Sequence, residues 1–455
     1  MLNNIPPSDI PLIFIRYSDD KKIRRVVIKM KKSTSIWQDR NFIKYFTANA
    51  LSNLGNWFDF VAVLILFRYS WKADPMLIAL IPIMYAIPSI LLGQFAGVFA
   101  DRRNKLRILV HSDWIRACLT LLLVFTSSPL LALPVLLLRN TVGVVSQPAQ
   151  QGLMRNIVDE EDIMKAVTIN GSLFQLVKVV GPLIGGSVAG IFSPGFSIVL
   201  NAASFVLSGF ILTRIHLINT TFKEKKILSD TKPLSFFTSW KEGWKIVFTS
   251  RILCASILFG ILTTMTIQMI DAQFVTLFSV VFPNKAELTG WVISAIGIGS
   301  LLIVLFLNRM KHIRKYGWFF GTGTMLLGIM TGGFGFLADY SFIVLAICLA
   351  FIGGIGNGVT FTAINYLIQK EPPKAAIGRV SGIMDSTLSI LFIIGPLLGG
   401  FMINQFGVLA AFRFIGICLT LIGMAGVLLQ KLIWKQNEST ILKGSEPLHE
   451  EKSFG

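Results

Sequence analysis

The segment Val179-Val180-Gly181-Pro182-Leu183-Ile184-Gly185-Gly186 returns 214 residues later as Ile393-Ile394-Gly395-Pro396-Leu397-Leu398-Gly399-Gly400. Each copy lies inside a long apolar stretch, where proline removes a backbone donor and glycines let a neighbouring helix approach closely. The repeat predicts two equivalent helical halves that pack at these sites. We expect packing or hinge positions at Gly181, Pro182, Gly185, Gly186, Gly395, Pro396, Gly399 and Gly400.

The composition excludes a water-soluble chain. Of the 455 residues, 53% are hydrophobic and only 15% are charged, and the mean hydropathy is +0.67. Soluble domains carry about a quarter of their residues as charged ones. Apolar stretches long enough to cross a bilayer as helices recur along the chain. We therefore predict an all-α polytopic membrane protein with twelve spans at 42–67, 76–98, 106–127, 129–151, 166–192, 196–213, 253–282, 288–307, 317–337, 342–368, 378–403 and 408–430.

The long interior connection, residues 214–252, is rich in lysine and separates six spans from six. It predicts an N-terminal half at 42–213 and a C-terminal half at 253–430, flanked by tails at 1–41 and 431–455. Residues 1–29 are charged and lack the apolar stretch of a signal peptide. Because Met30 opens a more natural start, we favour an over-extended gene start over a functional arm.

The basic residues predict the orientation. The tails, the central loop and every second short loop hold 35 of the 42 Lys and Arg residues, and the opposite face holds three. Positive charge concentrates on cytoplasmic loops, so both termini are expected in the cytoplasm and the chain in the cell membrane. The net charge of +18 is divided among separate loops, so we expect no nucleic-acid partner.

The loop after the second span reads Gly97-Val98-Phe99-Ala100-Asp101-Arg102-Arg103-Asn104-Lys105-Leu106-Arg107. Asp101 supplies a carboxylate beside several cations, which suits an ionic contact that can break. We predict a conformational latch formed by Gly97, Asp101, Arg102, Arg103 and Lys105. Asn104 could take a left-handed conformation in this turn. The alternative is a basic loop that only determines topology.

This loop resembles the loop 2–3 signature of the major facilitator superfamily, Gly-x-x-x-Asp-Arg-x-Gly-Arg-Arg. Asn104 replaces a glycine and Leu106 replaces a basic residue, and the corresponding Asn308-Arg309-Met310-Lys311 has no carboxylate. The resemblance covers roughly residues 40–430. It implies twelve helices in two six-helix halves that rock against each other and expose a central site to either side in turn.

Further stretches resemble the drug:proton antiporter branch that includes macrolide efflux proteins and a siderophore exporter. These are Arg139 with Gly143 and Pro148 in the fourth span, the Gly-Pro motif of the fifth, and the segments 52–59 and 240–244. In that branch a similar arginine is implicated in proton coupling. A charge inside a span marks a functional site or a buried pair, and Arg139 fits either.

Polar residues follow one face of the first span. Asn49, Asn53, Asn56 and Asp59 recur at helical spacing and are expected to line a water-accessible cavity. Aligning the first and seventh spans at an offset of 212 places Asp59 on Asp271 and Asn56 on Gln268. A carboxyl group removed from water can hold a proton near neutrality. Each aspartate is therefore a candidate for coupling, unless it is permanently paired to a cation.

Two more charges lie within spans. Lys178 is near the middle of the fifth span, too deep to reach either surface easily. Asp385 is in the cytoplasmic half of the eleventh span, where its repeat counterpart is Gly171. They could form charge pairs in the cavity or bind an anionic substrate.

These features predict a secondary active transporter, most simply a proton-coupled exporter of amphipathic drug-like molecules that works as a monomer. The alternatives are a dedicated exporter of one metabolite such as a siderophore, an uptake symporter or, from another class, a non-transporting receptor, which would not need acidic residues in paired spans. We expect no enzyme, because no catalytic cluster is present at one membrane depth, and no ATP hydrolysis, because no Walker-type loop is present. Scattered cysteines and histidines predict no metal and no cofactor. The expected partners are a small-molecule substrate, protons and lipid.

Overall fold

The computed structural model describes residues 36–215, 236–310, 315–337, 343–373 and 376–434, and these residues are helical apart from short connections. The predicted start at Met30 and most of both tails lie outside this range. The spanning helices of the N-terminal half are α1 (Arg40–Ile65, continued by η2, Leu66–Ser70), α2 (Pro75–Asp101), α3 (Lys105–Val124), α4 (Pro129–Ile157), α5 (Ile163–Ile191) and α6 (Pro194–Thr213).

The C-terminal half repeats this pattern. Its spanning helices are α8 (Arg251–Ile270) with α9 (Phe274–Val281), α10 (Leu288–Leu307), α11 (Tyr316–Gly335), α12 (Ile343–Lys370), α13 (Ile377–Phe406) and α14 (Val408–Leu428). Short helices lie at η1 (Ile36–Gln38), η3 (Glu160–Asp162) and α15 (Gln430–Ile433). Each of the twelve predicted spans therefore has a helical counterpart, which confirms the fold class.

Ten of the helical segments in the described ranges are long and apolar enough to span a membrane by themselves. The helices α3 and α11 are not among the ten, yet each has its place in one of the two bundles. The predicted span at 253–282 is broken, because a 3-10 turn, η4 (Asp271–Gln273), separates α8 from α9. The central connection also contains a helix, α7 (Phe236–Thr249), whose Trp244 and Val247 pack on the end of the C-terminal half.

The turns on the face opposite the basic loops follow a common local rule. A polar residue occupies the N-cap position and proline takes the first helical position in Asp74-Pro75, Ser128-Pro129 and Ser193-Pro194. The side chains of Asp74 and Ser193 accept a capping hydrogen bond, whereas that of Ser128 does not. Proline fits there because that backbone N–H has no partner within the helix. Asp74 Oδ1 accepts a hydrogen bond from Leu77 N at 2.9 Å, which completes the cap of α2.

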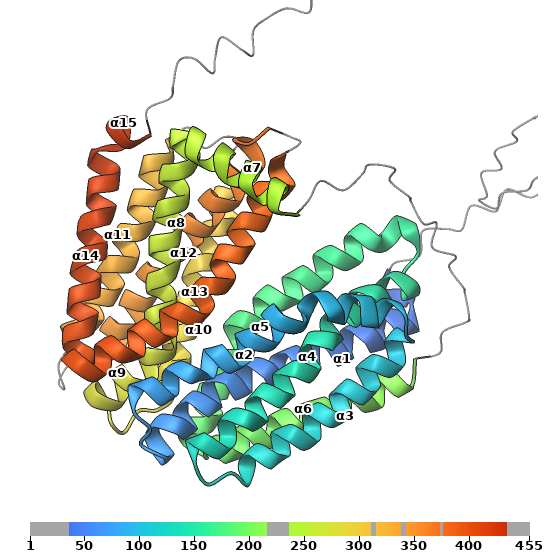
Figure 1. Ribbon diagram of the computed structural model, residues 1–455. Helices are drawn as coiled ribbons and strands as arrows, with labels where there is room; N and C mark the ends of the chain where they lie inside the picture. Colours follow the sequence, from blue (N-terminus) through green and yellow to red (C-terminus); the bar gives the residue numbers. More distant parts are fainter. Residues whose placement is uncertain (1–35, 216–235, 311–314, 338–342, 374–375, 435–455) are drawn as a thin grey trace, which may run out of the picture.

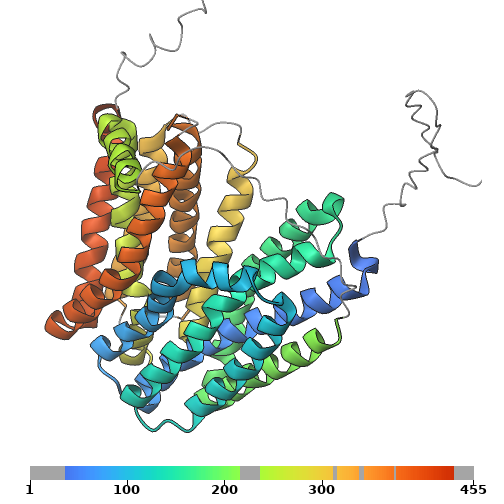
Figure 2. The same cartoon turned by 45° about the vertical axis from the view of Figure 1, so that its right-hand side comes forward.

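The two halves meet at one end and separate at the other (Figures 1 and 2). At the meeting end, Ala272 and Val275 of the C-terminal half belong to an apolar cluster built mainly from α1, α2 and α4. At the other end, beside the basic loops, the N-terminal half and the C-terminal half each have a cluster of their own. The described helices thus form two bundles that are in contact at the face opposite the basic loops.

Two of the repeated glycines, Gly186 and Gly400, lie at the contact between the halves. A Cβ on Gly186 of α5 would come within 2.7 Å of Gly290 Cα on α10. Similarly, a Cβ on Gly400 of α13 would come within 3.0 Å of Pro75 O on α2. Nearby, Trp291 Nε1 donates to Ser187 Oγ at 2.9 Å. The predicted packing role of these two glycines therefore has a specific location, the crossings α5–α10 and α2–α13.

A candidate site: a polar cavity and a buried charge network

A cavity of about 970 Å³ lies between the halves. It reaches Tyr45, Arg155 and Ile163, which lie near the ends of α1, α4 and α5 beside the basic loops. At the opposite face Arg68 of η2 closes the gap, because its Nε donates to Ser279 Oγ of α9 at 2.7 Å. Among the described residues, the cavity therefore opens toward the basic face.

The cavity wall is rich in carboxamides. They are Asn49, Asn53, Asn56, Asn140, Gln147, Gln150, Gln151, Asn170 and Gln268. Several bond to one another: Asn53 Nδ2 donates to Asn49 Oδ1 at 2.7 Å, and Asn49 Nδ2 donates to Asn170 Oδ1 at 3.1 Å. Aromatic side chains, including Trp57, Phe60 and Phe392, complete the wall. Such a surface can hold a molecule that is partly apolar and also makes many hydrogen bonds.

An ion pair lies behind this wall. Asp59 on α1 is fully buried, Arg139 on α4 is 2% exposed, and Arg139 Nη1 lies 2.6 Å from Asp59 Oδ2. Tyr85 on α2 links the pair to the cavity: its hydroxyl accepts from Arg139 Nη2 at 2.7 Å and donates to Asp59 Oδ2 at 3.4 Å. Tyr85 lines the cavity, whereas Asp59 and Arg139 do not. Burial makes this pair sensitive to any change of charge on either member.

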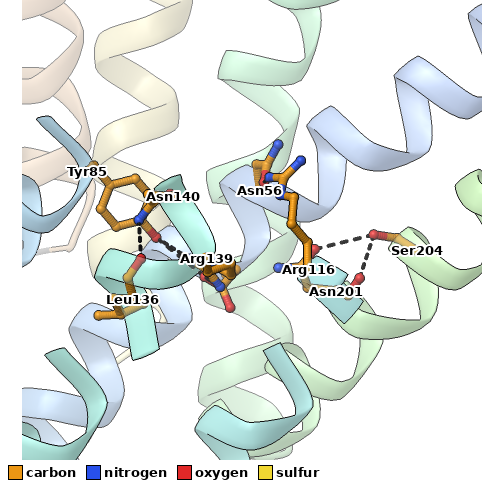
Figure 3. Close-up of polar contacts among 9 residues, drawn as sticks. Asn56, Tyr85, Arg116, Leu136, Arg139, Asn140, Asn201 and Ser204 are labelled. Carbon is orange, nitrogen blue, oxygen red and sulfur yellow. Dashed lines mark hydrogen bonds and ion pairs between the residues drawn. The ribbon is translucent and has the colours of Figure 1, made fainter. Parts of the chain in front are cut away.

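A second arginine, Arg116 on α3, lines the cavity. Figure 3 shows it beside Asn56. It is 7% exposed, its Nη2 donates to Asn56 Oδ1, and its guanidinium lies 4.1 Å from the centre of the Phe205 ring. Asp113, one turn earlier on α3, is buried and accepts a 2.6 Å hydrogen bond from Ser208 Oγ on α6. The N-terminal half thus buries two acids and two arginines, whose formal charges cancel.

The first-span prediction is right for three residues and wrong for one. Asn49, Asn53 and Asn56 line the cavity, but Asp59 points away from it and toward Arg139. An α-helix turns by about 100° per residue, so side chains spaced alternately by three and four residues shift gradually around the helix axis. Relative to Asn49, Asn56 is rotated by only about 20° and Asp59 by about 80°. Asp59 therefore belongs to the face of α1 that turns to α4.

The predicted alignment of spans one and seven is shifted by one residue. Gly181 faces the Cβ atom of Trp57, and its repeat partner Gly395 faces the Cβ atom of Gln268. In the same way Gly185 faces Phe58 and Gly399 faces Met269. These equivalent contacts differ by 211 positions, so Asp271 corresponds to Phe60 and Asp59 to Ile270.

Asp59 and Asp271 therefore do not occupy equivalent positions in the two halves. Asp271 lines the cavity, as Phe60 does, and interacts electrostatically with Lys178. Lys178 itself is exposed and lies outside the cavity wall, with no acid within 4.0 Å among the described residues. Asp385 is exposed and also outside the wall. The structure therefore groups the candidates into Asp59 with Arg139, Asn56 with Arg116, and Asp271 near Gln268.

The predicted latch lies at the open end. Asp101 ends α2, is exposed, and has no ion pair within the part of the chain that the structure describes. A Cβ on Gly97 would meet no atom within 4 Å, whereas Lys105 packs on Gly152 of α4. The left-handed conformation suggested for Asn104 is wrong: its φ is −68°, and it caps α3 by accepting from Arg107 N. An asparagine N-cap needs an extended backbone.

The sequence interpretation missed Arg116, Asp113 and Tyr85 as site residues. Arg116 and Asp113 are charges three residues apart inside a predicted span. The rule that singled out Arg139, that a charge inside a membrane helix marks a functional site or a buried pair, applies equally to them. Tyr85 gave no such signal, because tyrosine is ordinary in a membrane helix.

This arrangement of two six-helix bundles around a polar cavity is that of a membrane transporter, and sequence comparison agrees. The sequence pattern of the Major Facilitator Superfamily matches residues 45–395 and 276–448. The chain belongs to this superfamily and is a multi-pass membrane transporter.

The chain is 29% identical over 395 residues to the uncharacterized MFS-type transporter YfiS of Bacillus subtilis, covering 86% of this chain and 94% of that one. It is 23% identical over 363 residues to the putative bacilysin exporter BacE of Bacillus subtilis, covering 77% and 85%. Its fold is similar to the crystal structure of the nucleoside transporter NupG, with a TM-score of 0.69 at 12% identity, over 88% and 100% of the chains.

Proposed function

We propose that this transporter is a proton-coupled exporter of small amphipathic molecules, related to the drug:proton antiporter branch, with both termini in the cytoplasm. On this orientation the cavity opens inward, where a substrate for export enters. The concentration of Lys and Arg on the open face supports the orientation. The similarity to BacE, which is named as a putative exporter, supports export as the direction of transport.

The observation that carries the proposal is the buried Asp59–Arg139 pair joined to the cavity through Tyr85. A proton on Asp59 would remove its negative charge and leave Arg139 buried without its counter-ion, which is costly. The bundle would then favour an arrangement in which Arg139 finds other partners. Substrate that displaces Tyr85 from the wall would disturb the same pair, so substrate and proton would each change the affinity for the other.

The exchange of states would use the two helix crossings as hinges. The helices α2 and α13 touch at Ala79 and Gly400 and part toward the open face. The two helices run in opposite directions, and Gly97 follows Ala79 by as many residues as Gly382 precedes Gly400. Extending the contact along both helices therefore places Gly97 opposite Gly382. Neither glycine has an atom within 4 Å of its Cβ position. We infer that these glycines close together in the outward-open state, which would bring Asp101 and the latch into play.

The test begins with the substrate. A deletion strain would be screened for changed drug susceptibility and changed metabolite export, and flux of the compound found would be measured in proteoliposomes with and without a pH gradient. Asp59→Asn keeps the size of the side chain and removes its carboxyl group. It should abolish accumulation against a gradient and spare some downhill exchange, and Arg139→Ala should impair coupling as well.

Asp162→Asn serves as a control, because Asp162 of η3 pairs with the exposed Lys165 in the first turn of α5, and neither residue lines the cavity. It should leave gradient-driven flux unchanged. A full response of Asp59→Asn to the pH gradient would show that the coupling acid lies elsewhere, with Asp271 as the next candidate.

A further inference from the structure

Arg116 has bonding capacity that the protein does not use. A guanidinium carries five N–H donors, yet in the described chain Nη2, bonded to Asn56, is its only nitrogen with a hydrogen-bond partner. Its Nε atom is buried with no partner in that same part of the chain. Phe205 covers one face of the group. A buried donor without a partner is unfavourable, so its retention beside a cavity points to a ligand that supplies the acceptor.

On the side toward α4, no side chain packs against this guanidinium. On α4 the neighbouring residue is Gly143, whose Cβ position would be 3.8 Å from Arg116 Nε, so no side chain covers the group there. Both residues line the cavity. Asp113 lies outside the cavity wall, accepts from Ser208, and comes no closer than 4.0 Å to Arg116 as an ion pair among the described residues. Arg116 is therefore held in place without being fully paired.

The cavity wall carries a net positive formal charge. Its charged residues are Arg116, Arg155 near the mouth, and Asp271. Outside the wall, Lys178 interacts electrostatically with Asp271, and Asp113 interacts with Arg116. An anion entering from the open face would meet Arg155 first and Arg116 deeper inside. The remaining polar surface is mostly carboxamide, which both donates and accepts hydrogen bonds and so complements amides and hydroxyls.

We propose that the cavity binds a small organic carboxylate carrying several uncharged hydrogen-bonding groups, with Arg116 as the ligand of the carboxylate. This inference rests on the proposed transport function and specifies its substrate class. It favours the dedicated exporter of a polar metabolite over a pump for lipophilic cations. A short peptide and a hydroxy acid share this chemistry, and the test separates them.

The test measures binding to the purified protein in detergent by titration calorimetry, with two matched pairs of probes. One pair is alanyl-tyrosine and its C-terminal amide, and the other is citrate and its trimethyl ester. In each pair only the acid offers a carboxylate to Arg116. We expect at least one acid to bind about tenfold to hundredfold more tightly than its neutral counterpart, as for a hydrogen bond to a charged group.

The variants assign this preference to one residue. Arg116→Gln should remove the discrimination between acid and neutral probe, and Arg116→Lys, which keeps the charge, should retain part of it. Arg413→Gln is the matched control, since Arg413 is an intramembrane arginine outside the cavity wall that donates to Gly335 O and lies by Phe336. It should keep the full preference.

Three results would overturn the proposal: neither acid binds, the neutral probes bind equally well, or the preference survives in Arg116→Gln. Its failure is distinguishable from that of the transport mechanism. Gradient-driven flux of a neutral or cationic compound without any acid preference would refute the carboxylate site alone. Acid-selective binding without proton-dependent flux would refute the coupling and leave the site intact.

Discussion

Adding one methyl group to Gly186 should shift the transporter toward its outward-open state. The new Cβ would lie 2.7 Å from Gly290 Cα, 3.0 Å from Gly290 N and 3.2 Å from Glu287 O, all backbone atoms that cannot move aside alone. Ordinary carbon contacts are about 3.5–4.0 Å, so α5 and α10 would have to separate by about 1 Å at the face where the halves meet. This overpacking costs about 1–3 kcal/mol.

The cost applies to the arrangement seen in the structure, where Gly186 and Gly290 bring α5 and α10 together, and we expect it to be smaller in an outward-open state in which this crossing loosens. A difference of about 1–3 kcal/mol corresponds to a roughly 5- to 150-fold shift in the ratio of the two states. Gly290→Ala should act in the same direction and more strongly, since its Cβ would lie 2.2 Å from Pro182 O.

The assay is labelling of a cavity cysteine from outside the cell. The four native cysteines are replaced by serine, Ser89 in the cavity wall is replaced by cysteine, and a membrane-impermeant maleimide is added to intact cells. Gly186→Ala should raise the labelling rate. Gly332→Ala is the control: it lies within one half, and its Cβ would have ordinary contacts at 3.5 Å. Equal labelling rates in Gly186→Ala and the parent would refute the reasoning.

Three further predictions follow from the two faces of the molecule. Arg68→Gln removes the donor to Ser279 Oγ that joins the halves at the closed face. Loss of one hydrogen bond of about 1 kcal/mol should raise the rate of external labelling about fivefold. An unchanged labelling rate would mean that this bond does not hold the face closed. Asp101→Asn should leave membrane abundance unchanged and slow transport, and undiminished flux would show that the loop determines topology only. Epitope tags at either terminus and within 220–235 should all be accessible only from the cytoplasm, and one external signal would overturn the orientation.

The sequence predicted the helices well because bilayer thickness imposes a minimum apolar length on each. It did not predict α7, whose 14 residues are too few to span, nor the turn at Asp271, which interrupts an apolar stretch without a proline or glycine. The one-residue error in aligning spans one and seven has a similar cause. The Gly-Pro repeat sets the register of α5 and α13 only, and helices one and seven have their own offset.

The sequence indicates which charged residues lie within the membrane helices, but it does not indicate which of them pair with one another. Asp59, Arg139 and Arg116 stand out as charges inside apolar spans. Which of them meet depends on helix rotation and packing, and a rotation of about 60° between Asn56 and Asp59 separates a cavity residue from a buried one. Tyr85, which connects the two environments, becomes visible only when α2 and α4 are side by side.

The charges carried by α3 also constrain how the protein is made. This helix contains Lys105, Arg107, Asp113 and Arg116 and is not among the segments apolar enough to enter a membrane alone. An arginine or aspartate at the centre of an inserting helix costs about 2.5–3.5 kcal/mol. The partners that offset this cost are Asn56 on α1, already synthesised, and Phe205 and Ser208 on α6, which leave the ribosome about ninety residues after α3. The contacts with Phe205 and Ser208 form only after α6 is made, so we expect stable insertion of α3 to depend on a helix synthesised later.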